Sequence, residues 1–218
     1  MDPIAPQTFH LKNWSFAAVD AEILYCMIRH FKPSIVFEVG SGNSTLMAAQ
    51  AVVQNSIEGH ACELISCDPH PSRELLLHGL PGLSRIVESR IENVPLTEFS
   101  RLKANDILFI DSSHNLRIGG DVQYEYLEIL PRLRKGVFVH AHDIFLPEEY
   151  PFDYVMNRRL FWTEQYLLQA FLSFNDSFRV VWSARYLHIH HPHALRAAFE
   201  SYDSVTSWPV SFWMQKIA

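Results

Sequence analysis

Two groups of polar residues in this sequence have the types and spacing that could do chemistry. The first is the turn Gly40-Ser41-Gly42-Asn43-Ser44, which follows the apolar run Ile35–Val39. Glycine lets the backbone turn sharply and approach a ligand without a Cβ in the way. A helix that starts at such a turn, capped by Asn43 or Ser44 near Thr45, presents free N–H groups. The segment therefore predicts a cradle for an anionic or nucleotide-like ligand.

The second group combines carboxylates and imidazoles. Asp111-Ser112-Ser113-His114 follows one apolar run, and His142-Asp143 follows another that includes His140. Such side chains suit proton transfer near neutral pH or metal binding. The structural alternative is that His140 and His142 are hydrogen-bonded residues at the end of a strand and that Asp143 caps a loop.

The elements that must position these residues alternate between strands and helices. Short apolar runs predict strands at 34–39, 63–68, 85–89, 106–111 and 136–140, and helical spacing predicts helices at 17–31, 45–54, 72–78, 94–102 and 120–132. Such alternation predicts right-handed βαβ units and a parallel sheet, in which ligands bind beyond the carboxyl ends of the strands. Those ends carry Gly40–Ser44, Asp68, Asp111 and His142-Asp143.

After residue 143 the pattern changes. We expect a lid over 147–151, a helix over 159–174, a strand over 178–182, a helix over 194–202 and a last strand over 211–217, antiparallel at the sheet edge. The histidine-rich run 188–193 has the composition of a metal site, but its position favours a solvated turn.

Several aromatic residues are assigned by position. Candidates for an acceptor pocket are Tyr150, Tyr154, Arg158, Arg159 and Trp162, because aromatic faces suit sugars or flat rings and arginines bind carboxylate or phosphate. For Trp162 and for Tyr166 we favour a core position between helix and sheet. Near the N-terminus, we expect Trp14 and Phe16 to anchor the chain onto the body.

Composition sets the broad class. The chain has 218 residues, 48% of them hydrophobic and 19% charged, and a formal net charge of −6, which argues against a nucleic-acid binder. No apolar stretch suits a membrane span and no secretory signal is visible, while Cys26, Cys62 and Cys67 suggest free thiols in a reducing, cytoplasmic setting. We expect one domain over 1–218, with 1–33 as an N-terminal helical extension.

The first motif also carries a family resemblance. Glu38-Val-Gly-Ser-Gly-Asn-Ser44 resembles motif I of class I S-adenosylmethionine-dependent methyltransferases. The resemblance implies an α/β, Rossmann-like methyltransferase fold: a mostly parallel seven-stranded sheet with helices on both faces and an antiparallel last strand. It implies that the glycine turn contacts the methionine end of the cofactor and that Asp68 takes the ribose hydroxyls. The implied cofactor-binding residues are Glu38, Gly40, Ser41, Gly42, Asn43, Ser44, Asp68, Arg90, Asp111 and Ser112.

The second group is similar to the metal-dependent sugar O-methyltransferases of macrolide and aminocoumarin biosynthesis. That resemblance implies Asp111, His142 and Asp143 as metal ligands, His114 as the base, and His114, His142 and Asp143 as the catalytic set. The family usually has an acid where His142 stands. Magnesium prefers oxygen ligands whereas imidazole suits transition metals. A divalent metal, magnesium or a transition metal, is therefore an open expectation.

Together these patterns predict an S-adenosylmethionine-dependent methyltransferase that acts on a hydroxyl oxygen of a small sugar-like or phenolic acceptor. Its expected partners are that small-molecule acceptor and a second copy in a homodimer, with no nucleic acid and no membrane. One alternative is a nicotinamide-dependent oxidoreductase, which the missing third glycine near Met47 and Ala48 disfavours. The other is a non-catalytic module that binds a cofactor or glycan.

Overall fold

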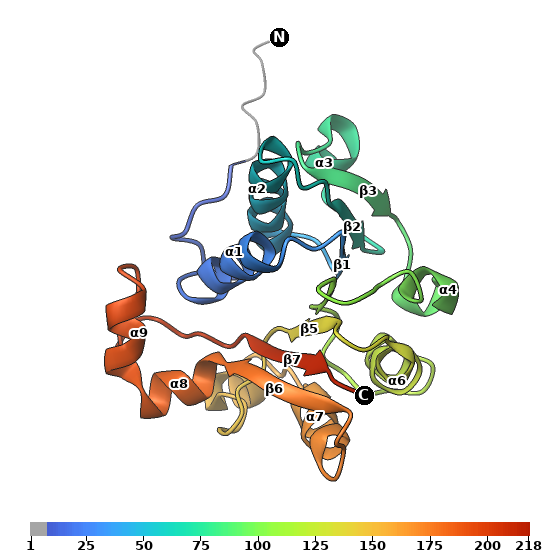
Figure 1. Cartoon of the computed structure of the whole chain (residues 1–218). Helices are drawn as coiled ribbons and strands as arrows, with labels where there is room; N and C mark the ends of the chain where they lie inside the picture. Colours follow the sequence, from blue (N-terminus) through green and yellow to red (C-terminus); the bar gives the residue numbers. More distant parts are fainter. Residues whose placement is uncertain (1–7) are drawn as a thin grey trace.

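The computed structural model describes residues 8–218, and one seven-stranded sheet runs through them (Figure 1). The strand order is β3-β2-β1-β4-β5-β7-β6; β1 to β5 run parallel, and β7 is antiparallel to both β5 and β6. The strands are β1 (Ile35–Val39), β2 (Glu63–Cys67), β3 (Leu83–Val87), β4 (Ile107–Ile110), β5 (Phe138–Ala141), β6 (Phe178–Ser183) and β7 (Phe212–Lys216). The predicted α/β sheet is confirmed.

One detail of the sheet prediction is wrong. The last strand, β7, is not at the edge but lies between β5 and β6, so β6 is the edge strand. The residues of β7 are buried on both faces, whereas β6 leaves Arg179, Val180 and Val181 exposed. A strand that is apolar on both faces is stabilised inside a sheet, where neighbours cover both its edges and its faces.

Helices cover both faces of the sheet (Figure 1). Within the described residues they are α1 (Asp20–Phe31), α2 (Asn43–Ile57), α3 (Arg73–His78), α4 (Leu96–Phe99), α5 (Asp121–Tyr124), α6 (Leu130–Arg132), α7 (Glu164–Leu172), α8 (Ala184–His190) and α9 (Pro192–Ala198). A short 3₁₀ turn, η1, covers Ile91–Asn93, and two π-helical turns cover Glu125–Ile129 (η2) and Asp153–Asn157 (η3). The turn η2 joins α5 to α6, so the expected helix over 120–132 contains a π-helical segment.

The core has two layers because successive strand residues point to opposite faces. Val36 belongs to the cluster on the side of α1 and α2, together with Leu24 and Ala48. Phe37, the next residue, belongs to the opposite cluster and packs on Phe99 at a ring separation of 4.8 Å. This two-sided burial holds the carboxyl ends of β1, β4 and β5 side by side, where the polar residues follow.

The N-terminal segment differs from its prediction. Residues 1–7 of the expected extension 1–33 lie outside the described residues, residues 8–19 are not helical, and α1 begins at Asp20. Phe16 is buried and anchors the segment as expected, but Trp14 is 99% exposed, so its predicted anchoring role is wrong.

Two further predictions, the start of the helix after the glycine turn and the solvated turn over 188–193, differ from the structure. The helix α2 begins at Asn43 with Gly42 as its N-cap: the Ser44 hydroxyl donates to Glu38, and the Thr45 hydroxyl accepts the Gly42 N–H while it donates to Glu38. The expected solvated turn over 188–193 is mostly helical: α8 ends at His190 and α9 begins at Pro192.

Helix α7 begins at Glu164, five residues later than expected. Among residues 8–218, no helix combines the length and the apolar character needed to cross a membrane.

Candidate functional site

The glycine turn follows β1 directly, and its two glycines serve different purposes. Gly40 has φ 98° and a side chain there would overlap the Asp111 carbonyl oxygen, so the close approach of β1 and β4 requires glycine. Gly42 has extended backbone and no protein atom within 4 Å of the position that a Cβ would take. The protein itself therefore does not require glycine at 42, which leaves that side of the turn open.

A first cleft, of about 420 Å³, lies beside this turn. Asp68 lines it from the end of β2, and the carboxylate accepts hydrogen bonds from the Ser41 hydroxyl (2.5 Å) and the His70 backbone N–H (2.7 Å). Of the predicted cofactor-binding residues, six line this cleft: Gly40, Ser41, Asp68, Arg90, Asp111 and Ser112. The other walls include Glu92, Arg117 and Asp121.

The remaining predicted cofactor residues lie beneath or beside the turn. Glu38 is 1% exposed, and its two carboxylate oxygens accept hydrogen bonds from the hydroxyls of Ser44 (2.6 Å) and Thr45 (2.7 Å). Burial raises the pKa of Glu38 to about 8 despite these bonds. Asn43 donates its side-chain amide to the Ser15 hydroxyl at 2.8 Å, which ties the N-terminal segment to α2. A direct cofactor contact by Glu38, Gly42, Asn43 or Ser44 stays a prediction.

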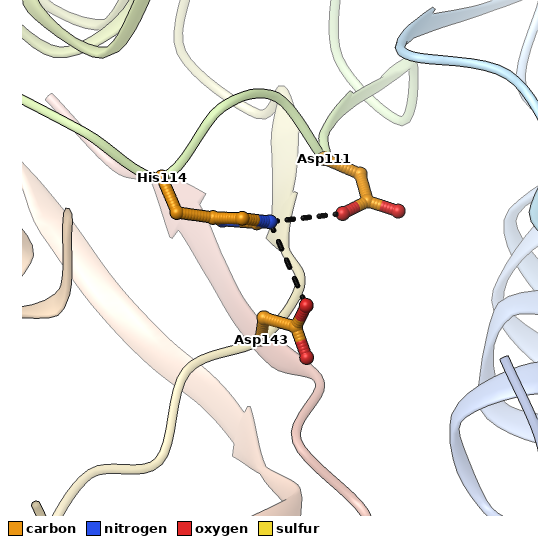
Figure 2. A group of neighbouring side chains, drawn as sticks. All are labelled: Asp111, His114 and Asp143. Atoms are coloured by element: carbon orange, nitrogen blue, oxygen red, sulfur yellow. Dashed lines mark ion pairs between the residues drawn. The ribbon is translucent and has the colours of Figure 1, made fainter. Parts of the chain in front are cut away.

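The second group of residues comes together at the ends of β4 and β5. Figure 2 shows Nε2 of His114 directed between the two carboxylates of Asp111 and Asp143, at 3.5 Å from an oxygen of each. The ligand atoms of these three residues lie within 4.8 Å of one another. His142 approaches from the side, with Nδ1 3.6 Å from Asp111 and 3.9 Å from Asp143. The geometry thus brings together all four residues.

His114 is held from behind by a buried carboxylate. Its Nδ1 lies 2.7 Å from Glu164 Oε2, and Glu164 Oε1 accepts a hydrogen bond from the Tyr126 hydroxyl at 2.9 Å. The His114 carbonyl in turn accepts the backbone N–H groups of Thr163 and Glu164 at the start of α7. Trp162 packs against the imidazole at a ring separation of 4.4 Å. These contacts fix the ring so that Nε2 faces the site.

The sequence interpretation missed Glu164 and Tyr126. Glu164 stands fifty positions after His114, and an acid in the first turn of a helix is explained equally well by the helix dipole. Tyr126 belongs to the π-helical turn η2, a helix irregularity that is frequent at functional sites and that helical spacing does not reveal.

The backbone is strained at two of the four site residues. His114 has φ 59° and Asp143 has φ 57°, a left-handed conformation that is uncommon for residues other than glycine. Such conformations cost free energy and persist where the surrounding structure imposes them, often at functional sites. Here the strain directs both side chains toward the same point.

Of the two neighbouring histidines, His142 belongs to the site and His140 belongs to the core. His142 Nε2 lies 3.5 Å from Asp20, whose carboxylate accepts the N–H groups of Val210 and Ser211. His140 instead stacks between Phe109 and Trp213 at 4.2 Å from each, and its Nε2 bonds the Ser211 hydroxyl. Burial keeps the pKa of His140 well below its usual value. His140 is therefore a neutral core residue, as the structural alternative holds.

Charge interactions outweigh burial at most of this site. Burial by itself lowers the pKa of His114 and His142. The hydrogen bonds that His114 donates to Asp111 and Glu164, and the charges of Asp143 and Asp111 beside His142, nevertheless leave both pKa values well above the usual one. Burial by itself raises the pKa of Asp111, but His142 and His114 hold it below its usual value. Burial leaves the pKa of Asp143 raised. The site holds opposite charges in close balance.

A second cavity, of about 680 Å³, is lined by two other members of this cluster. His142 and Asp143 line it together with Asp20, the segment 11–18, residues 151–154 and the loop 201–210. The first cleft contains Asp111 and the second contains His142 and Asp143. Since His142 lies within 4 Å of both Asp111 and Asp143, neighbouring members of one His–Asp cluster line the two cavities.

The predicted acceptor-pocket residues are mostly placed elsewhere. Only Tyr154 lines the second cavity; Tyr150 is buried, and the Arg158 guanidinium covers the Tyr154 ring at 4.4 Å. The core assignment of Tyr166 is wrong, because this side chain is 45% exposed and bonds Glu149. Trp162 is partly buried against His114 and so contributes to the site.

Comparisons with known proteins bear on the family and the fold of this chain. Residues 37–144 match the family model of a methyltransferase domain, which supports a methyltransferase family for the segment from β1 to the end of β5. An uncharacterized protein of Archaeoglobus fulgidus is 27% identical over 101 residues, which cover 45% of this chain and 44% of that protein. The chain thus spans less than half of that relative.

Solved structures extend the comparison to the whole fold. A "putative methyltransferase" from Thermobifida fusca YX has a TM-score of 0.52 at 15% identity, over 91% of this chain and 79% of that one. This likeness shows the Rossmann-like fold of the methyltransferases. The apo structure of CmcI-N160 has a TM-score of 0.49 at 14% identity, over 91% of this chain and 71% of that one.

Proposed function

We propose that this protein is an S-adenosylmethionine-dependent methyltransferase that acts on a hydroxyl oxygen of a small sugar-like or phenolic acceptor. One observation carries the proposal: members of a single His–Asp cluster line two cavities at the carboxyl end of the parallel strands. A transfer between two bound molecules needs such an arrangement, because positioning of the reactants supplies much of the rate. The matched methyltransferase domain covers the first cavity and the cluster.

The first cleft fits the cofactor chemically. Asp68 offers two acceptor oxygens, which suit the vicinal hydroxyls of a ribose. Four carboxylates and two arginines line the cleft, which suits a ligand that carries both a carboxylate and excess positive charge. Residues that would hold it are Gly40, Ser41, Asp68, Arg90 and Asp111. When bound, S-adenosylmethionine supplies a methyl group activated by its sulfonium.

The proposed base is His114, which does not line the second cavity itself but whose Nε2 lies 3.5 Å from Asp143 in its wall. Nδ1 is bonded to Glu164, so Nε2 is the atom that can receive the proton of an acceptor hydroxyl when the imidazole is neutral. Glu164 stabilises the imidazolium that forms, and the Tyr126 hydroxyl holds Glu164 in place. The raised pKa means that the free protein holds a proton on His114 near neutral pH. His114 must first release this proton to solvent, and a cation bound beside Asp111 would favour that loss because it would offset the carboxylates that raise the pKa of His114.

As an alternative to accepting a proton, Nε2 of His114 could bind a divalent metal. Asp111, His114 and Asp143 place their ligand atoms within 4.8 Å, and this set contains His114 in place of the expected His142. The imidazole ligand suits a transition metal better than magnesium. Nε2 cannot both bind a metal and accept a proton, so the two roles exclude each other.

A chelator separates these roles. If His114 acts as the base, dialysis against EDTA is expected to leave the methyl-transfer rate within about twofold, because no step needs a cation. Metal analysis of the purified protein is the companion measurement. Loss of the rate with EDTA, and its return with one divalent metal, would assign Nε2 to a metal and contradict the base.

The cofactor assignment is tested by calorimetry with S-adenosylhomocysteine. The wild-type protein is expected to bind it at micromolar concentration and to show no binding of NAD. Asp68→Ala is expected to weaken binding by about tenfold or more, because it removes two charged acceptor oxygens. Asp153→Ala, which removes an acid from the second cavity, is the matched control and should bind normally. NAD binding in place of S-adenosylhomocysteine would favour the oxidoreductase and sink the proposal.

The proposal includes three further properties of the protein. They are a homodimer, a cytoplasmic location and membership of the metal-dependent sugar O-methyltransferase branch. Turnover of any hydroxyl acceptor would rule out the non-catalytic binding module.

A further inference from the structure

The second cavity is built almost wholly by chain outside the matched domain 37–144. Its walls come from residues 11–20, 151–154 and 201–210, and only His142 and Asp143 belong to the match. The walls from the two ends of the chain are joined directly: Asp20 accepts the N–H groups of Val210 and Ser211, and the Ser201 hydroxyl donates to Glu22. The cavity is thus a fixed feature of the fold.

One wall presents an exposed tryptophan on an ordered turn. Asn13 organises this turn, since its side chain donates to the carbonyls of His10 and Phe16 and accepts the N–H groups of Ser15 and Phe16. Phe16 is buried against His142 at a ring separation of 5.0 Å. Between these anchored residues, Trp14 lines the cavity while 99% exposed. Its full apolar surface is available to a ligand.

The loop 201–210 forms another wall of the cavity, and it too presents an exposed tryptophan on an ordered turn. Asp203 organises the loop by accepting the N–H groups of Val205 and Thr206, and its own N–H bonds the Ser207 hydroxyl. Trp208 follows, with the Arg185 guanidinium over its ring at 4.1 Å and half of its surface exposed. The Ser207 hydroxyl accepts its bond from Asp203 and keeps a free O–H to donate. The cavity is therefore lined by both aromatic side chains and hydroxyl groups.

The charges on the walls are mainly negative. Asp20, Asp143 and Asp153 line the cavity, against Lys12 and the imidazole of His142. Asp20 already accepts two backbone N–H groups, so it contributes charge more than free hydrogen-bonding capacity. The arginines at 158 and 159 are not among the lining residues. A carboxylate or phosphate on the acceptor would face these acids without a guanidinium partner.

We propose that the second cavity binds the acceptor as an uncharged sugar ring stacked on Trp14, and that Trp14 is a specificity-determining residue. This inference rests on the proposed function, since it names the acceptor of the same reaction. A sugar ring presents an apolar face for the aromatic walls and several hydroxyls for the polar ones. A phenol has too few hydroxyls to satisfy the polar groups that it would bury. One hydroxyl of the sugar lies at the His142–Asp143 end of the cavity.

The test is ligand-observed NMR on protein saturated with S-adenosylhomocysteine. The probes are a panel of neutral methyl glycosides, the matching methyl glycosides of uronic acids, and catechol. We expect at least one neutral glycoside to bind at least tenfold more tightly than its uronic acid partner and than catechol. Trp14→Ala should weaken that binding at least tenfold. Phe174→Ala, which removes an equally exposed aromatic outside the cavity, should not change it.

The negative results of this test distinguish failure of the acceptor inference from failure of the proposed function. A preference for uronic acids or catechol, no glycoside binding, or normal binding by Trp14→Ala overturns this inference. If S-adenosylhomocysteine itself fails to bind in calorimetry, the proposed function fails first. Binding of S-adenosylhomocysteine by Trp14→Ala at wild-type affinity shows that this variant is folded.

Discussion

Replacing His114 by alanine is expected to lower the methyl-transfer rate by about 10²- to 10⁴-fold, the range that a positioned base contributes. His114 is the residue whose Nε2 faces both Asp111 and Asp143 while Nδ1 is held by Glu164. Calorimetry should give an unchanged affinity for S-adenosylhomocysteine, because His114 does not line the first cleft. The rate is measured under single-turnover conditions, so that product release does not mask the chemical step.

The control for His114→Ala is His188→Ala. His188 lies in α8 and bonds the Tyr202 hydroxyl, away from the His–Asp cluster, so its loss should leave the rate unchanged. A normal rate in His114→Ala, with the protein folded by circular dichroism, would contradict the role of His114.

Glu38→Gln is expected to give the protein a higher free energy of unfolding than the wild type at pH 8. Near pH 5 the free energies of unfolding of the variant and the wild type should be nearly equal. Burial raises the pKa of Glu38 from 4.5 to about 8. As pH rises from 4.5 to 8, the unfolded chain loses this proton while the folded protein keeps it, so the folded state loses stability across this window. At roughly 1.4 kcal/mol per pH unit, the difference at pH 8 amounts to about 4 to 5 kcal/mol.

Urea unfolding at pH 5 and pH 8 checks this prediction, with Glu74→Gln on the exposed side of α3 as the control. Glutamine can still accept from the Thr45 hydroxyl and donate to Ser44, which preserves the two contacts of Glu38. An equal stability difference at both pH values would show that Glu38 ionises normally in the folded protein.

Much of the architecture was predictable because periodicity is a local property. The parallel strands follow from short apolar runs, and the placement of Asp68, Asp111 and His142-Asp143 follows from the rule that ligands bind at the carboxyl ends of such strands. The position of β7 inside the sheet was not predictable from its own residues. It depends on which neighbour covers each edge, and apolar composition alone does not choose between a central strand and an edge strand.

The sequence indicated the four clustered residues Asp111, His114, His142 and Asp143, but not the contacts that hold them. Sequence spacing indicated His114, but its partner Glu164 belongs to a helix fifty positions away and is brought close by tertiary structure. Trp14 resembles a core anchor in sequence, since an aromatic residue near Phe16 fits either role. Only the turn organised by Asn13 turns it outward. The position of Glu164 beside His114 and the exposure of Trp14 thus depend on the folded structure, which local sequence patterns do not reveal.

A crystal of this protein soaked with S-adenosylhomocysteine tests the central claim most directly. The account predicts density in the first cleft, with the ribose hydroxyls on Asp68, the amino-acid end at the Gly40–Gly42 turn and the sulfur directed toward Asp111. The second cavity, beside Trp14 and Asp143, should stay free for the acceptor. Density in the second cavity instead, or an empty first cleft at saturating ligand, would contradict the assignment of the two cavities to cofactor and acceptor.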